Sequence, residues 1–390
     1  MSIKEEALKL HAQWKGKIEV ISKVSVKTAY DLSLAYTPGV AEPCMAISRN
    51  SEEVYAYTGK GNMVAVITDG TAVLGLGDIG PLAALPVMEG KALLFKEFAG
   101  VDAFPICLAS KDVDTIVETI KTIAPGFGGI NLEDISSPRC VEIERRLKKE
   151  LDIPVFHDDQ HGTAIVVASA LINSLKIVGK EFKNITVALN GAGSAGAAIT
   201  RMLLNLGTFN LIACDKSGII NRDEVYENWV HAELAQITNR DNKKGTLAEA
   251  MEGADVFIGV SKKDAVTQAM IRSMAPEAIV FVLANPDPEI MPDLAKRAGA
   301  RIIGTGRSDF PNQINNVLAF PGIFRGALDA RATDINEAMK IAAAEALASL
   351  VEPSELSEEY IIVTPFDPRV GKTIADAVKK AAVDSGIARI

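Results

Sequence analysis

The chain has 390 residues and a formal net charge of -9 at pH 7, with 48% hydrophobic and 23% charged residues. This length exceeds what a single hydrophobic core usually serves, so we expect two domains. The acidic balance argues against binding to nucleic acid or to anionic membranes, both of which attract basic surfaces.

The first 20 residues predict an amphipathic helix, because charged residues are interspersed with spaced apolar ones. They lack the continuous apolar core of a signal peptide. The longest apolar run, residues 164–172, is shorter than the ~18 residues that suggest a membrane span. The four cysteines show no CxxC spacing, which indicates reduced thiols and favours a cytoplasmic protein.

The segment Tyr30–Pro43 is interpreted as a loop with a turn at Thr37-Pro38 and few apolar anchors. Strands and helices alternate beyond it. Strands are expected at 63–68, 103–108, 129–132 and 153–156, and helices at 83–98, 112–123 and 162–175. Another helix begins at Ser137 and Pro138, with the serine as its cap and the proline in its first position.

The alternation resumes after Gly179. Strands are expected at 185–189, 211–214, 256–260, 279–283 and 302–304, and helices at 195–206 and within 332–390. Short strands alternating with helices predict parallel sheets with helices on both faces. We therefore expect an α/β protein with a smaller α/β domain over residues 1–160. Residues 161–390 should form a Rossmann-type, doubly wound parallel sheet with C-terminal helices, which could pack on either domain.

Two segments match the GxGxxG pattern. The first, Gly75–Gly80, contains Asp78, which would repel a pyrophosphate, and is followed by Pro81. The second lies between an apolar strand and a helix of small residues, which is the context of a dinucleotide-binding loop. Its residues are Gly191, Ala192, Gly193, Ser194, Ala195 and Gly196. We interpret the first match as a structural turn that could line the site from the other domain.

Asp215 ends the strand that follows the second motif. A carboxylate at this position accepts hydrogen bonds from ribose hydroxyls and repels a 2′-phosphate. Lys216 and Arg222 lie close by in the sequence and would favour that phosphate. The sequence therefore favours NAD slightly and leaves NADP open.

Two pairs of carboxylates, Glu133-Asp134 and Asp158-Asp159, each follow a predicted strand. The carboxyl ends of neighbouring parallel strands meet at one edge of a sheet, where ligands bind. Loop acids are usually only solvated, but two pairs at matching positions favour an oxygen site for Mg²⁺ or Mn²⁺. His157 and His161 leave zinc as the weaker alternative.

Several motifs, in order along nearly the whole chain, resemble those of the malic enzyme family. They are AYTPGVA at 35–41, GLGD at 75–78, MEGK at 88–91, FKEFAG at 95–100, NLED at 131–134, FHDDQHGT at 156–163 and NNVLAFPG at 315–322. The length is similar to that of compact bacterial members. The resemblance implies oxidative decarboxylation of L-malate to pyruvate and carbon dioxide with NAD or NADP, and decarboxylation of oxaloacetate as a related activity.

The resemblance also implies roles for individual residues. Lys91 matches the base that takes the hydroxyl proton, and Tyr36 matches the acid that protonates the enol. The residues that match metal ligands are Glu133, Asp134 and Asp159. Asp158 matches a neighbouring acid that pairs with Lys91. A lysine base must be neutral, so we expect burial or the metal to lower its pKa.

Three asparagines match substrate positions: Asn285, Asn315 and Asn316. Asn285 is also expected beside the cofactor, because it follows the predicted strand 279–283. Larger members of the family carry an arginine just before the GLGD motif, where this chain has Thr71-Ala72-Val73-Leu74. Another donor must therefore hold the malate carboxylate.

Two alternatives remain from the sequence. One is a malolactic-type conversion of malate to lactate, and the other is a dinucleotide sensor without turnover. The presence of Lys91, Tyr36 and every metal acid weighs against the sensor.

Compact bacterial members resembling this chain are dimeric, so we expect a homodimer. The first helix would offer an apolar stripe to a partner, formed by Ile3, Ala7, Leu10 and Trp14. We hypothesise shared active sites, in which Tyr36 enters the site built by Lys91 and Glu133 of the other subunit.

Overall fold

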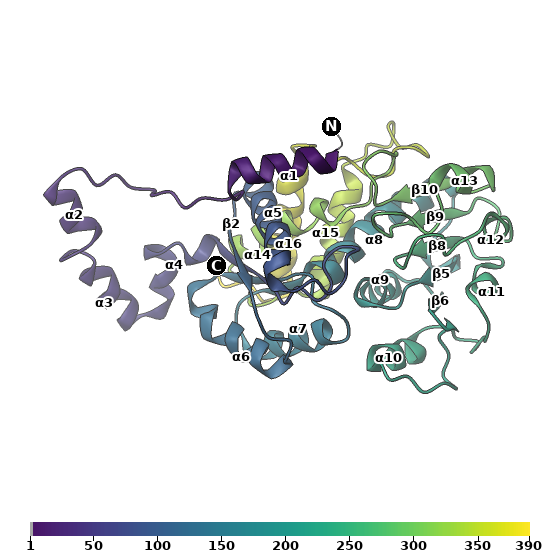
Figure 1. Cartoon of the computed structure of the whole chain (residues 1–390), viewed down its shortest axis with the longest axis horizontal. Helices are drawn as coiled ribbons and strands as arrows, with labels where there is room; N and C mark the ends of the chain where they lie inside the picture. Colours follow the sequence, from purple (N-terminus) through teal and green to yellow (C-terminus); the bar gives the residue numbers. More distant parts are fainter. Residues whose placement is uncertain (1–2) are drawn as a thin grey trace.

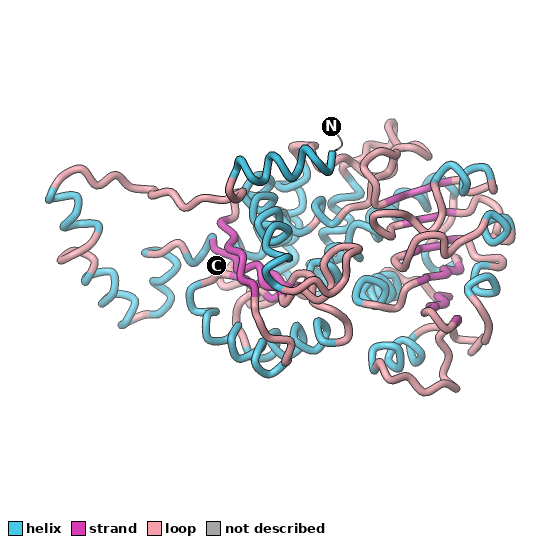
Figure 2. Tube along the Cα trace, in the orientation of Figure 1, coloured by secondary structure: helices cyan, strands magenta, loops and turns pink. Residues whose placement is uncertain are grey.

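Two parallel sheets organise the chain in the computed structural model, which describes residues 3–390 (Figures 1 and 2). The first sheet has the order β2-β1-β3-β4 and consists of β1 (Met63–Thr68), β2 (Asp102–Cys107), β3 (Gly129–Leu132) and β4 (Val155–His157). The second has the order β10-β9-β8-β5-β6-β7 and consists of β5 (Thr186–Asn190), β6 (Asn210–Asp215), β7 (Gly218–Ile219), β8 (Val256–Gly259), β9 (Ile279–Val282) and β10 (Ile302–Thr305). All pairs are parallel except β6 with β7. The predicted α/β fold with a Rossmann-type second sheet is confirmed.

Helices cover both sheets. Those near the first sheet are α5 (Pro81–Ala99), α6 (Val113–Ile123) and α7 (Arg139–Glu150). Those of the second are α9 (Ser194–Asn205), α10 (Trp229–Ile237), α11 (Leu247–Met251), α12 (Gln268–Arg272) and α13 (Pro292–Arg297). Short 3₁₀ turns are η1 (Ser51–Glu53), η2 (Lys60–Asn62), η3 (Ala124–Gly126), η4 (Phe182–Asn184) and η5 (Asn316–Leu318). The long runs of buried apolar residues in the strands explain why the sheets need cover on both faces.

Helix α8 (Asp158–Val178) lies between the two sheets and ends at Gly179, whose φ of 65° suits glycine (Figure 1). Fourteen of its 21 residues are buried. Its length and composition would allow it to cross a membrane, but 67% of that stretch is buried inside the structure, which is typical of a core helix. The helix begins at Asp158 and not at Gly162 as predicted, because the two acids form its first turn.

The C-terminal helices return to the first part of the chain. They are α14 (Phe320–Asp329), α15 (Glu337–Ser349) and α16 (Val370–Asp384). Helix α14 packs on α5, with the rings of Phe320 and Phe324 centred 4.8 Å and 5.2 Å from that of Phe95. Helix α15 packs along α8. The domain division at residues 160 and 161 stays a prediction.

Residues 18–50, here called the arm, extend away from the body (Figures 1 and 2). The arm holds α2 (Ala29–Ala35) and α3 (Ala41–Arg49), and it joins α1 (Ile3–Trp14) to α4 (Val54–Tyr57). The prediction of a loop over Tyr30–Pro43 is therefore wrong. Thr28 begins α2 with a capping box, in which its side chain accepts the N–H of Asp31. No residue of the arm is buried.

The predicted serine cap on the helix after residue 136 is also wrong. Helix α7 begins at Arg139, so Ser137 lies one position too early to cap it, and its buried hydroxyl has no hydrogen-bond partner among the described residues. The guanidinium of Arg139 instead forms an ion pair of 2.7 Å with the buried Asp69.

Candidate active site

Lys91 lies at the centre of a buried cluster of charges. It projects from α5 with only 7% of its side chain exposed. Its Nζ lies 2.6 Å from Oδ2 of Asp158 and 2.8 Å from Oε1 of Glu133. The ring of Phe320 covers it, with the centroid 4.1 Å from Nζ. The predicted pairing of Lys91 with Asp158 is therefore present.

The protonation of Lys91 differs from the expectation. Burial alone would lower the pKa of Lys91, but Asp158 and Glu133 stabilise the ammonium and raise the pKa above its usual value. The carboxylates therefore hold the proton on this lysine in the site as it stands. A divalent cation that neutralised the acids would remove this effect, so metal and base are coupled by charge.

Three carboxylates converge beside this lysine: Glu133, Asp134 and Asp159. One oxygen from each lies within 4.8 Å of the others. The first two follow β3 and the third lies in the first turn of α8, so the carboxyl ends of β3 and β4 bring them together. The backbone N–H of Asp134 donates to Oδ2 of Asp159 at 2.8 Å. The geometry matches the predicted metal group.

The backbone at Asp134 is held in an uncommon conformation. Its φ is 54°, a left-handed value that Asp and Asn tolerate better than most side chains. Its carbonyl accepts the N–H of Ala72 at 2.9 Å, and Oδ1 lies 3.4 Å from the N–H of Leu74. The segment before the GLGD motif therefore fixes the orientation of this carboxylate.

The protonation and hydrogen bonding of the three acids favour the binding of a cation. Burial raises the pKa of Glu133 to about 7 and that of Asp134 to about 8, although Lys91 opposes both shifts. The Oδ2 atom of Asp134 is buried and has no hydrogen-bond partner among the described residues. An orphaned carboxylate oxygen in an all-oxygen group is what a hard divalent cation such as Mg²⁺ or Mn²⁺ would satisfy, so the residues fit the metal.

Asp158 is fully buried and meets the C-terminal part of the chain. Burial raises its pKa to about 7, whereas Lys91 and the side chain of Asn316 lower it. A Cβ added at Gly162 would lie 1.8 Å from Oδ1 of Asp158 and 3.2 Å from Cβ of Asn316, which explains the glycine. Asn316 therefore lies at the site. The side chain of Asn315 accepts the N–H of Val317 at 2.9 Å and caps η5, and no contact with the acids is seen.

The histidines do not join the metal group, which contains no histidine or cysteine among residues 3–390. His161 uses both ring nitrogens elsewhere, with Nε2 2.8 Å from Glu144 and Nδ1 3.1 Å from Lys340. His157 is fully buried at the end of β4, and its Nδ1 lies 3.9 Å from Oδ2 of Asp159 but outside the group of convergent oxygens. The zinc alternative has no support in this geometry.

The glycine loop between β5 and α9 fits a dinucleotide. Gly191 has a φ of 109°, and a Cβ there would lie 2.6 Å from the carbonyl oxygen of Val260. A Cβ at Gly196 would lie 1.8 Å from the oxygen of Gly191. A Cβ at Gly193 would meet nothing within 4 Å, so the backbone there is open to an approaching phosphate. Asp215 ends β6, as predicted, at the same edge of the sheet.

The first glycine motif meets the second sheet directly. A Cβ at Gly75 would lie 2.4 Å from the backbone oxygen of Asn285 and 3.0 Å from Pro286. Asp78 pairs with Lys111 at 2.6 Å, which suits a structural turn. The loop therefore connects Asn285 with Leu74 and the metal acids, across the boundary between the two sheets.

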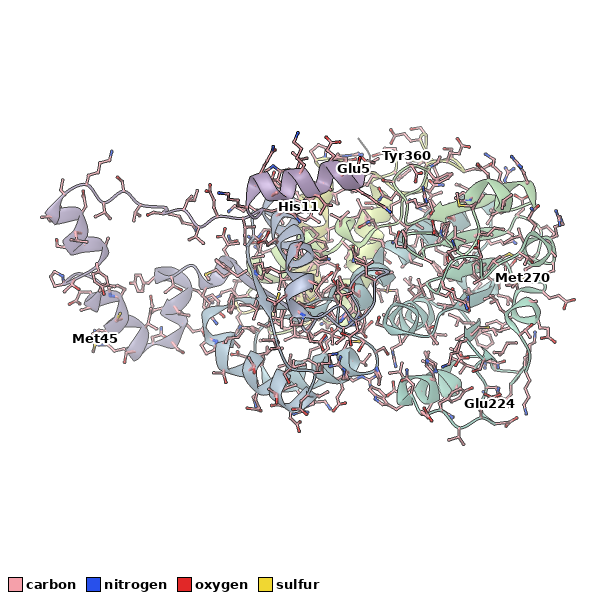
Figure 3. All side chains as sticks on the ribbon, in the orientation of Figure 1. Glu5, His11, Met45, Glu224, Met270 and Tyr360 are labelled. Carbon is pink, nitrogen blue, oxygen red and sulfur yellow. The ribbon has the colours of Figure 1, made fainter. Side chains whose placement is uncertain are left out.

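Tyr36 is the predicted catalytic residue that the structure does not bring to Lys91. It ends α2 on the arm, and its side chain is 66% exposed. Met45, on the next helix, lies on the same projecting arm in Figure 3. Within one chain, helix α2, which ends at Tyr36, and helix α5, which carries Lys91, therefore lie on separate parts of the molecule (Figure 1).

Two buried acids with roles near the site were missed from the sequence. Glu289 accepts the N–H groups of Ser261 and Ala284, at 2.8 Å and 3.2 Å, and so ties the ends of β8 and β9 together. Glu144 accepts the N–H of His157 at 3.1 Å and holds the junction from which α8 starts. A signal for Glu144 was available, because it lies in the apolar stripe of α7.

Comparisons with known proteins agree with this geometry. Residues 15–148 match the family model of the malic enzyme N-terminal domain, and residues 160–383 match that of the malic enzyme NAD binding domain. The chain is 61% identical, over its full length and 95% of the relative, to a bifunctional malic/malolactic enzyme of Bacillus subtilis. It is 60% identical to an NAD-dependent malic enzyme of Geobacillus stearothermophilus, over 96% of this chain and 78% of the relative. A crystal structure of malic enzyme from Pyrococcus horikoshii superposes with a TM-score of 0.95 and 52% identity, over 100% of this chain and 92% of that chain.

Proposed function

The chain belongs to the malic enzyme family, and we propose that it oxidatively decarboxylates L-malate to pyruvate and carbon dioxide, with NAD or NADP as the oxidant and a divalent cation. The observation that carries this proposal is the contact of the buried Lys91 with Asp158 and Glu133, beside three convergent carboxylates. A binding module without turnover would have no use for a buried lysine among acids, which is costly to keep.

Each residue of the site has a separate role in the proposed reaction. Lys91 takes the proton of the C2 hydroxyl, with Asp158 holding its Nζ in place. Tyr36 delivers a proton to C3 of the enol that remains after carbon dioxide leaves. A cation held by Glu133, Asp134 and Asp159 would supply Lewis-acid polarisation, and the dinucleotide would supply the hydride acceptor. Phe320 and the surrounding core exclude water from the lysine.

The working unit in this proposal is a homodimer with shared sites. Eleven large hydrophobic side chains of the arm are exposed: Ile18, Val20, Ile21, Val24, Val26, Tyr30, Leu32, Leu34, Tyr36, Val40 and Met45. So many exposed large apolar side chains within one segment favour an interaction surface. A second copy is the partner that gives the arm a function, because Tyr36 can then reach a Lys91 that it does not reach in its own chain.

NAD is the favoured cofactor in this proposal. Asp215 lies at the end of β6, where its carboxylate would meet the ribose hydroxyls and repel a 2′-phosphate. The relative of Geobacillus stearothermophilus is named as NAD-dependent, whereas others at 48% and 49% identity are named as NADP-dependent. We place the protein in the cytoplasm, in line with its four free cysteines.

A malolactic conversion is the second candidate, because the relative at 61% identity is named as bifunctional. The test is turnover of L-malate by the purified protein with Mn²⁺ and either NAD or NADP. We expect reduced dinucleotide and pyruvate to appear in equal amounts. Lactate without net reduced dinucleotide would identify the malolactic reaction, and no consumption of malate would refute an enzyme of this class.

A further inference from the structure

Asp215 has one ion-pair partner among residues 3–390, and that partner is a histidine. Its Oδ2 lies 3.3 Å from Nδ1 of His231, and the other oxygen accepts the N–H of Ser217 at 2.7 Å. The side chains of Asp215 and His231 are 13% and 19% exposed, so solvent screens the contact only in part. Asp215, which the proposed function places at the cofactor ribose, is therefore paired with a histidine.

His231 is held in this position by its own helix and by one ring. Asn228 caps α10 by accepting the N–H of Val230 at 3.0 Å, which sets the first turn of the helix. The ring of Tyr226 lies edge-on to the imidazole, with centroids 5.9 Å apart. The capped first turn therefore places the backbone of His231 beside Asp215, and the ring of Tyr226 packs against the imidazole.

The other charged groups around α10 are engaged with each other. Glu233, two residues further along the helix, pairs with Arg145 of α7 at 2.7 Å and with Arg201 of α9 at 2.5 Å. Lys216 forms no ion pair in the part of the chain that the structure describes. His231 is therefore the group in ion-pair contact with Asp215, while Lys216 adds a constant charge nearby.

We propose that His231 is a specificity-determining residue, whose charge decides how strongly Asp215 discriminates against the 2′-phosphate of NADP. This proposal rests on the proposed dinucleotide-dependent function. With a neutral imidazole the Asp215–His231 pair carries one negative charge and repels the phosphate. With an imidazolium the pair is neutral, and NADP is accepted more readily. A histidine side chain can exist in either form.

The test compares the preference for NAD over NADP at two pH values. Ionisation of the catalytic groups affects turnover with both dinucleotides equally and cancels in this ratio. The value of kcat/KM for NAD, divided by that for NADP, is measured at about pH 6 and about pH 8 for the wild type, His231→Gln and His11→Gln. His11 is an exposed histidine on α1, far from α10, and serves as the matched control (Figure 3). The 2′-phosphate itself ionises near pH 6, and the slope that persists in His231→Gln measures that contribution.

We expect the ratio to fall at the lower pH by about threefold to tenfold more in the wild type and in His11→Gln than in His231→Gln, as a unit charge at this range predicts. Equal slopes in the wild type and His231→Gln would overturn the proposal.

A second measurement needs neither malate nor turnover. Calorimetry gives the affinity for 2′,5′-ADP relative to 5′-AMP, and we expect His231→Lys to raise this ratio about tenfold at pH ~8, since it places a permanent cation beside Asp215. No gain would contradict the proposal, as would a wild-type ratio that does not change with pH. If binding follows the expectation but malate is not consumed, the proposed function fails while the role of His231 stands.

Discussion

The arm and helix α8 both carry residues of the proposed active site, but they differ in how far the chain buries them. Between residues 18 and 50 no side chain is buried, whereas 14 of the 21 residues of α8 are buried. The acids at the start of α8 are held by the core, and their geometry is fixed within one chain. Tyr36 has no such support. In the function proposed above, the site is complete only when the arm packs against a second copy of the chain, because no part of its own chain buries it.

Substitution of Lys91, which contacts the start of the buried helix α8, should have the largest effect on activity and stability. Lys91→Ala should lower kcat by about 10³-fold or more, because it removes the base. It should also destabilise the fold by about 3–5 kcal/mol, because Asp158 loses its buried partner. Steady-state kinetics and denaturant unfolding measure the two effects.

The matched control is Lys96→Ala. Lys96 lies on the same helix, is 56% exposed and pairs with Asp102, so we expect a change of less than about 1 kcal/mol and normal kcat. Equal losses in the two variants would show that the buried cluster has no special role.

Asp134→Asn tests the metal group. Asparagine tolerates the left-handed backbone at this position, so the variant should fold while losing one ligand charge. We expect the dissociation constant for Mn²⁺, measured by electron paramagnetic resonance, to rise about 100-fold or more. Dinucleotide affinity should stay unchanged, as should Mn²⁺ binding in Asp114→Asn, at an 81% exposed side chain. Unaltered Mn²⁺ binding in Asp134→Asn would place the metal elsewhere.

Glu144→Gln tests how firmly the body holds the start of α8. Burial alone would raise the pKa of Glu144, but His161 and Lys340 lower this pKa well below its usual range. A depressed pKa gives stability that is present above the unfolded value, near pH 4.3, and is lost as the pH falls further. The variant should lose about 1.5–3 kcal/mol of unfolding free energy near pH 7.

This deficit should shrink below about pH 4, where the wild type also loses the charge. The control is Glu142→Gln, because Glu142 lies on the same helix and is 46% exposed. A pH-independent deficit would mean that the loss is one of packing and not of charge.

Much of this arrangement could be predicted from the sequence, where local pattern decides structure. The strands at Met63–Thr68 and Gly129–Leu132 are found at the predicted bounds, because short apolar runs between polar residues leave few choices. The strand-end position of Asp215 follows from the same pattern. The coupling of Lys91 to Asp158 spans 67 residues and could be expected only from the family resemblance.

The arm was misjudged for a physical reason. The apolar side chains of its helices are not buried by the rest of the chain. The sequence of the arm therefore lacks the apolar periodicity of a helix that packs on a core, and this periodicity is what would have predicted the helices. The pair formed by Asp215 and His231 was also missed, because it depends on how α10 packs at the end of β6.

Leu34→Asp tests the arm as a dimer surface. Leu34 is 59% exposed in the single chain, and a charge there would be buried in the proposed interface. We expect dimer affinity to fall about tenfold in sedimentation experiments, with activity lost on dilution. Val225→Asp, at a fully exposed apolar residue outside the arm, should change neither. A wild-type protein that is monomeric and fully active would contradict the proposal that the arm completes the active site of a second copy.

Shared sites are tested most directly by mixing two defective subunits. Tyr36→Phe should lose about 10²-fold or more in turnover, and Lys91→Ala should be inactive. Subunits carrying different affinity tags are coexpressed, and the mixed dimer is purified through both tags. If the tyrosine crosses to the neighbour, one site of each mixed dimer has both defects and the other has none, so we expect about half of wild-type activity. Activity no higher than the mean of the two parent variants would contradict shared sites and place Tyr36 in the site of its own chain.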